Sequence, residues 1–63
     1  MDVPRGKTAL VTGGAKRIGR VICLALADEG INVVFNYRKS KTEANQTLKD
    51  LEAKGIRALA IQA

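Results

Sequence analysis

The chain has 63 residues, enough for one small domain, and a domain of this size buries only about 60% of the surface that its unfolded form exposes. With one cysteine and no histidine, it can form neither an internal disulfide nor a histidine-containing metal site to stabilise that domain. Eleven Lys and Arg against six Asp and Glu give a net charge of +5, which favours a phosphate-bearing partner.

Membrane and export signals are not expected in this sequence. Residues 1–6 contain no apolar core of a signal peptide, and the longest apolar run, Val21 to Ala27, is far shorter than the roughly 20 residues that cross a bilayer. The lone Cys23 lies within that run, so we expect a buried thiol that packs as a small hydrophobe and suits a reducing compartment. These features indicate a soluble cytoplasmic protein without membrane partners.

The first half of the chain reads as a strand followed by a helix. Lys7 to Thr12 contains a continuous apolar run ended by glycines, which is typical of a strand covered on both faces. From Arg17 to Glu29 the apolar residues fall three and four apart, which predicts a helix, and Gly30 is expected to end it in the left-handed conformation. The residues with this spacing are Ile18, Val21, Ile22, Ala25 and Leu26.

The second half repeats the alternation. Ile31 to Asn36 is β-branched and aromatic, as a buried strand requires. Ser40 with Glu43 forms a capping-box pattern that begins a helix ending before Gly55, with an apolar stripe of Ala44, Leu48 and Leu51. Arg57 to Gln62 is apolar again and predicts a third strand, so the element order is βαβαβ.

Alternating strands and helices predict a parallel sheet with right-handed crossovers. A strand order of 3-2-1 would place both helices on the same face of the sheet. The opposite face would then be bare, although the strands are apolar on both sides. We therefore expect a segment absent from this sequence to cover that face.

A glycine-rich turn joins the first strand to the first helix. Gly13 and Gly14 directly follow the strand, and Gly19 falls in the first helical turn, where a missing side chain lets helix and strand approach closely. Such a turn presents free N–H groups and the positive end of the helix dipole to a phosphate. A nucleoside triphosphate loop is excluded because Gly14 and Gly19 are followed by Arg20-Val21 instead of Lys and Ser or Thr, and the ordinary G-x-G-x-x-G spacing is also absent.

Thr12, Gly13, Ile18 and Gly19 resemble the T-G-x-x-x-G-x-G turn of the short-chain dehydrogenase/reductase family, with Arg17 in place of the usual middle glycine. This arginine variant, with the Asn36-Tyr37-Arg38-Lys39-Ser40 stretch, is similar to pteridine reductases and related NADPH-dependent reductases. The resemblance implies an α/β fold, the truncated first βαβαβ half of a Rossmann-type doubly wound parallel sheet. Residues 1–63 would be the N-terminal part of a single dinucleotide-binding domain.

The cofactor implied is NADP (NADPH). No acidic residue stands between Gly30 and Thr42, where an NAD site usually carries one for the adenosine ribose. Arg38 offers a planar fork and Ser40 a hydroxyl for the 2′-phosphate, with Lys16 or Arg17 reaching across from the turn. The expected cofactor-binding residues are Gly13, Gly14, Lys16, Arg17, Ile18, Gly19, Tyr37, Arg38 and Ser40.

Simpler interpretations of these residues stay open. The loop cations could be merely solvated, and Ser40 could serve only as a helix cap. By position, Lys16, Arg17, Arg20, Arg38, Lys39 and Lys41 could converge on one anion, whereas Lys49 and Lys54 fit an ordinary solvated helix face.

The family reduces carbonyl or imine groups with Ser, Tyr and Lys, the last two spaced Tyr-x-x-x-Lys. Tyr37 and Lys41 have this spacing but fall at the adenosine end of the implied site, so we interpret the match as coincidental and assign no catalytic residue. The implied function is NADPH-dependent reduction of a small carbonyl or pterin-like substrate by the complete protein, expected to be a dimer or tetramer. The alternatives are a noncatalytic nucleotide-binding module and, from net charge alone, a nucleic-acid-binding fragment, which lacks stacking aromatic residues.

With one sheet face and two strand edges open, the isolated 63-residue chain is expected to aggregate or to stay partly unfolded. Circular dichroism and size measurement at micromolar concentration test this expectation. A cooperative unfolding transition of a monomer would contradict it.

Overall fold

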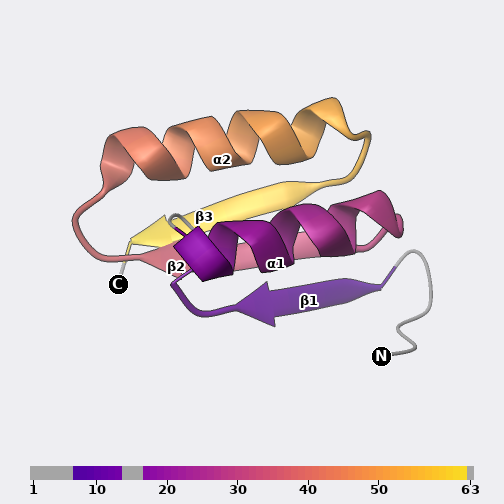
Figure 1. Cartoon of the computed structure of the whole chain (residues 1–63), viewed down its shortest axis with the longest axis horizontal. Helices are drawn as coiled ribbons and strands as arrows, with labels where there is room; N and C mark the ends of the chain where they lie inside the picture. The colour runs from indigo at the N-terminus through magenta and orange to yellow at the C-terminus, as the bar shows by residue number, and fades with distance from the viewer. Residues whose placement is uncertain (1–6, 14–16, 63) are drawn as a thin grey trace.

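Local sequence signals set the order of the elements in the computed structural model, which describes residues 7–13 and 17–62 (Figure 1). A strand and a helix alternate along the chain, as the periodicity predicts. The elements are β1 (Thr8–Val11), α1 (Arg17–Asp28), β2 (Asn32–Tyr37), α2 (Lys41–Ala53) and β3 (Ala58–Gln62). Among the described residues, neither helix has the length and apolar character needed to cross a membrane.

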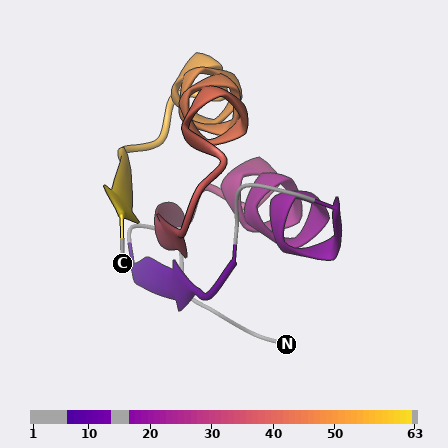
Figure 2. The ribbon, with the colours of Figure 1, turned by 90° about the vertical axis from the view of Figure 1, so that its left-hand side faces the viewer.

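The strands form one sheet in the order β1-β2-β3, which is the order considered from the sequence, and the predicted parallel pairing is confirmed. Both helices lie on the same side of this sheet (Figure 2). That arrangement follows from right-handed crossovers between strands that are neighbours both in sequence and in the sheet. The predicted half of a Rossmann-type fold is therefore present.

The hydrophobic core fills the space between the sheet and the two helices. In β2, the side chains of Val33 and Phe35 are fully buried, whereas Val34 between them is only half-buried, because successive residues of a strand point to opposite faces. The buried apolar cluster consists of Val11, Cys23, Ala27, Val33, Phe35, Ala44 and Leu51. The predicted burial of Cys23 is confirmed, and desolvation raises the pKa of its thiol although Arg20 acts in the opposite direction.

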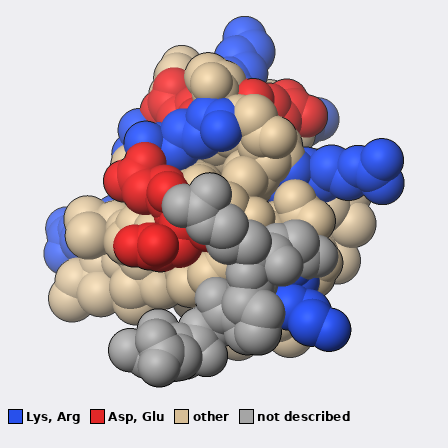
Figure 3. All heavy atoms as spheres, turned by 90° about the vertical axis from the view of Figure 1, so that its right-hand side faces the viewer, with Lys and Arg blue, Asp and Glu red and all other residues tan. Residues whose placement is uncertain are grey.

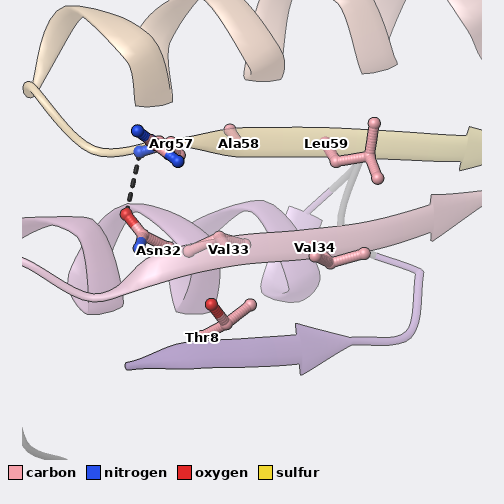
Figure 4. A pocket seen from close by; sticks show the side chains of 7 residues that line it. All are labelled: Thr8, Asn32, Val33, Val34, Arg57, Ala58 and Leu59. Carbon is pink, nitrogen blue, oxygen red and sulfur yellow. Dashed lines mark hydrogen bonds between the residues drawn. The ribbon is translucent and has the colours of Figure 1, made fainter. Parts of the chain in front are cut away.

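The opposite face of the sheet is apolar and is covered by none of the described residues. Leu10, Val34 and Leu59 lie in register across the three strands. Leu10 is 70% exposed and Leu59 is 55% exposed. A shallow hollow on the sheet is lined by Thr8, Asn32, Val33, Val34, Arg57, Ala58 and Leu59 (Figure 4). The bare face expected from the strand order is thus observed.

The apolar residues whose spacing predicts α1 are mostly not those that face the sheet. Cys23 and Ala27 are buried against it, while Ile18, Val21 and Ile22 are exposed on the other side of the helix. The helix is apolar around most of its circumference, so spacing alone does not select the face that packs. Docking on Val33 and Phe35 makes that choice.

The sequence predicts how α1 ends and how α2 begins, and the structure confirms only the first of these predictions. Gly30 has φ of 78°, and the N–H groups of Gly30 and Ile31 bond to the carbonyls of Ala27 and Leu26, which is a Schellman end for α1. The capping hydrogen bond that the sequence predicts for the Ser40 side chain is absent among the described residues at the start of α2. Ser40 holds the N-cap position, but with ψ of 63° its side chain makes no capping hydrogen bond within the described chain.

Arg20 joins the two helices, which corrects the expectation that it converges with the loop cations on an anion. Its Nη1 donates to the hydroxyl of the fully buried Thr47 at 2.9 Å, and its Nη2 pairs with the Asp50 carboxylate. Asp50 also accepts a hydrogen bond from Gln46 Nε2 at 2.9 Å. The guanidinium therefore satisfies a buried hydroxyl and a carboxylate at once.

Lys54 is likewise more than a solvated helix residue, because it pairs with Asp28 at the far end of α1. Seen from this end, acidic and basic side chains lie side by side over the helix ends (Figure 3). Lys54 and Asp28 thus compensate each other's charge at this end of the molecule.

Replacement of Asp50 by Asn is expected to reduce the loss of stability in acid. Hydrogen bonds from Arg20 and then from Gln46 lower the pKa of Asp50, so its stabilising effect is present above the ordinary Asp pKa of about 3.9 and is lost as the pH falls through the lower folded-state value. Thermal unfolding of the complete protein between about pH 2 and pH 6 checks this. Glu52→Gln, at an exposed position on the same helix, is the control, and equal pH dependence of the two variants would contradict the prediction.

Candidate functional site

The carboxyl ends of all three strands meet at one edge of the sheet, at the left of Figure 1 and facing the viewer in Figure 2. Both helices begin at this edge, so the connection after β1 and the connection after β2 lie there together. In open parallel sheets, ligands bind outside the carboxyl ends of the strands. We refer to this region as the carboxyl edge.

Gly13 leaves β1 with φ of 67°, in the left-handed region. A Cβ added there would meet nothing within 4 Å, so the need for glycine is conformational and not a matter of space. The predicted site residues Gly14 and Lys16 lie outside the described residues.

Arg17, the first residue of α1, is exposed and has φ of 50°. A side chain in this left-handed conformation costs about 1–2 kcal/mol relative to glycine. Glycine would adopt this conformation without that cost. Arg17 adopts it with a side chain and adds a cation beside the start of the helix.

The first turn of α1 opens onto the same edge. Ile18 is 76% exposed and Gly19 is half-buried, and the leading N–H groups of a helix have no partner within the helix. Together with the helix dipole, such groups attract an anion. Ile18 and Gly19 lie in this first turn, whereas Arg20 turns away toward α2.

The connection after β2 carries the other predicted residues. Tyr37 ends β2 and packs against the core cluster, while Arg38 is exposed and Ser40 is half-buried. Tyr37 and Lys41 belong to a strand and a helix, respectively, so they do not form the pair on a single helix that the catalytic spacing requires. The match to Tyr-x-x-x-Lys is consistent with coincidence.

Two polar side chains at this edge were not assigned a role from the sequence. Asn36 Oδ1 accepts a hydrogen bond from the Gly13 N–H at 2.6 Å, and Gln62 Nε2 donates to the Arg38 carbonyl at 3.1 Å. Both amides lie at or next to the carboxyl end of a strand. That position is the only feature of the sequence that could have indicated their contact with a neighbouring connection. Their partners are 23 and 24 residues away in the sequence.

Charge is distributed unevenly between the two ends of the described chain. The described cations at the carboxyl edge are Arg17, Arg38, Lys39 and Lys41. Of the described acidic residues, only Glu43 lies in the first turn of a helix that starts there, and the others follow or occupy the second halves of the helices, at Asp28, Glu29, Asp50 and Glu52. The carboxyl edge is therefore positive, which suits a phosphorylated ligand.

Residues 7–63 match the family model for short chain dehydrogenases. The chain is 51% identical over 57 residues to the 3-oxoacyl-(acyl-carrier-protein) reductase FabG of Staphylococcus epidermidis, covering 90% of this chain and 23% of that protein. It is 45% identical over 58 residues to versicolorin reductase 1 of Dothistroma septosporum, covering 92% and 22%. The chain thus spans about a quarter of the length of the curated relatives it matches.

Solved structures agree with this relation. A short chain dehydrogenase from Burkholderia cenocepacia in complex with NADP superimposes with a TM-score of 0.91 and 47% identity, covering 94% of this chain and 24% of that one. A blue fluorescent protein from a metagenomic library, in complex with NADPH, gives a TM-score of 0.90 and 48% identity, covering 94% and 25%. Together with the match over residues 7–63, these similarities show that the chain belongs to the short-chain dehydrogenase family.

Proposed function

We propose that residues 1–63 are the N-terminal part of a single dinucleotide-binding domain and that the complete protein is an NADPH-dependent oxidoreductase. The observation that carries this proposal is the exposed Arg38 at the same edge of the sheet as the left-handed Gly13 turn, with no acidic residue between Gly30 and Thr42. Similar structures bound to NADP or NADPH support the choice of cofactor. When bound, NADPH supplies the hydride for the reduction.

The pyrophosphate would lie at the start of α1. Gly13 turns the chain away from β1, and the first N–H groups of α1, at Arg17, Ile18 and Gly19, have no partner within the helix and would bind an anion. From the sequence, Gly14 and Lys16 are expected to complete this part of the site. These residues bind and orient the cofactor, and they do not take part in the hydride transfer itself.

The 2′-phosphate would lie at the connection after β2. Arg38 is exposed there and can pair with a phosphate through two N–H groups, while Ser40, whose hydroxyl makes no capping bond in the described chain, can add a donor. Lys16 or Arg17 would approach from the turn, and Tyr37 would fix the start of the loop through its packing. A carboxylate at this place would repel the 2′-phosphate.

The acid that protonates the reduced substrate would come from residues that follow this chain, because Tyr37 packs against the core and is not on one helix with Lys41. We propose a carbonyl or pterin-like substrate, in line with the reductases among the relatives. We expect the complete protein to be a cytoplasmic dimer or tetramer. An NADPH-binding protein that reduced no such compound would instead be a noncatalytic nucleotide-binding module.

Arg38→Ala is expected to weaken binding of NADPH by about tenfold in the complete protein and to leave NADH nearly unchanged, because a charge-assisted pair with the 2′-phosphate is worth about 1.5 kcal/mol or more. Arg38→Asp should reverse the preference. Fluorescence titration with both nucleotides measures the ratio of dissociation constants. Lys49→Ala removes an exposed cation from the middle of α2 as a control, and an unchanged ratio in the Arg38 variants would count against the proposal.

Gly13→Ala and Gly55→Ala separate backbone strain from cofactor binding. Both glycines have positive φ, 67° and 86°, and a Cβ at either would meet nothing within 4 Å, so each substitution should destabilise the protein by about 1–2 kcal/mol. Only Gly13→Ala should also weaken NADPH and NADH, because Gly55 follows α2 at the other end of the molecule. Thermal unfolding and nucleotide titration check this, and equal effects of the two variants on nucleotide affinity would refute it.

A further inference from the structure

Two side-chain amides hold the two connections of the carboxyl edge. Asn36 accepts a hydrogen bond from the backbone N–H of Gly13, after β1, and Gln62 donates one to the backbone carbonyl of Arg38, after β2. Each bond fixes one connection to the strand that follows it in the sheet. Neither amide belongs to the residues assigned to the cofactor above.

The bond of Asn36 fixes the orientation of Gly13 after the end of β1. Asn36 lies in β2 with its backbone paired to Ile61 of β3, so its side chain extends from a fixed frame. The Gly13 N–H is consumed by Oδ1 at 2.6 Å and is not left for a phosphate. Asn36 therefore acts on an anion at the helix start only through the orientation of Gly13, where the chain adopts its left-handed conformation.

The bond of Gln62 acts on a different part of the edge. Gln62 is paired with Tyr37 in the register of β2 and β3, and its Nε2 reaches the carbonyl of the next residue, Arg38, at 3.1 Å. The backbone that carries the exposed guanidinium is thus held to the end of β3. Loss of this bond would loosen Arg38 without touching Gly13.

We propose that Asn36 and Gln62 are positioning residues for two separate parts of the cofactor, an inference that rests on the proposed function. Asn36 holds the turn that receives the pyrophosphate, which NADPH and NADH share. Gln62 holds the backbone of the residue that receives the 2′-phosphate, which only NADPH carries. The two amides therefore control affinity and cofactor preference separately.

Asn32 provides a matched control at the opposite end of β2. It lies on the same face of the strand as Asn36, and its Oδ1 also accepts a hydrogen bond from a backbone N–H, that of Arg57, at 2.9 Å (Figure 4). The two asparagines thus make bonds of the same type in the same strand. Only Asn36 makes its bond at the carboxyl edge.

The experiment compares Asn36→Leu, Gln62→Leu and Asn32→Leu in the complete protein, with dissociation constants for NADPH and NADH measured beside thermal unfolding. Asn36→Leu should weaken both nucleotides by the same factor, roughly fivefold to tenfold, because without its hydrogen bond Gly13 is no longer held in the orientation that receives the pyrophosphate. Gln62→Leu should weaken NADPH by roughly threefold to tenfold and leave NADH unchanged. Asn32→Leu should lower thermal stability and change neither affinity.

Asn36→Asp tests the positioning role without removing the acceptor. A carboxylate can accept the Gly13 N–H, so thermal stability should return toward the wild-type value, whereas its charge beside the pyrophosphate should keep NADPH and NADH weakened by equal factors. Weakening of NADPH alone would place Asn36 at the 2′-phosphate and would contradict its assigned role. This variant also serves if Asn36→Leu fails to fold.

Equal effects of Asn36→Leu and Asn32→Leu on NADH affinity would overturn the role of Asn36. Equal weakening of NADPH and NADH by Gln62→Leu, or no change in either, would overturn the role of Gln62. A wild-type protein that binds neither nucleotide would contradict the proposed function itself. Normal binding by the wild type together with unaltered binding by both variants would contradict only this inference.

Discussion

Right-handed crossovers between adjacent parallel strands are the constraint on which the rest of this structure depends. Because β1, β2 and β3 are neighbours in sequence and in the sheet, both crossovers must pass over the same face, and both helices lie there. Parallel strands also bring their carboxyl ends to one edge. The same rule therefore creates the buried core, the bare apolar face marked by Leu10 and Leu59, and the polar edge where the connections meet.

Some of the cations form ion pairs between the two helices, and others are exposed at the carboxyl edge. Arg20 is committed to Thr47 and Asp50, and Lys54 to Asp28, so these cations hold α1 and α2 together over the core. Arg17 and Arg38 are exposed at the edge. The cations of this small chain therefore have two roles: some join the helices through ion pairs, and others can attract an anionic ligand.

Backbone conformation at the edge is set by a mixture of local and distant causes. Gly13 adopts positive φ without steric cost because it lacks a Cβ atom. Arg17 adopts it at a free-energy cost that the surrounding structure must offset. Side chains distant in sequence then fix the connections, through Asn36 on Gly13 and Gln62 on Arg38. Within the described residues, side chains at the ends of β2 and β3 therefore contribute to the backbone positions of the site, as the glycine turn does.

The sequence by itself determined the element order, the parallel sheet, the family and the placing of Gly13 and Arg38, because apolar periodicity, glycine and charge act over a few residues. It did not determine which face of α1 packs, since Ile18 and Val21 are as apolar as the buried Cys23 and Ala27, and only docking on β2 distinguishes them. The side chain of Ser40 makes no capping hydrogen bond within the described residues although the residue stands at the N-cap, because its ψ of 63° lies outside the extended region that capping residues usually adopt. The partners of Arg20, Asn36 and Gln62 lie 23 to 30 residues away, and only the tertiary structure decides contacts over such separations, because they form when the strands and helices pack.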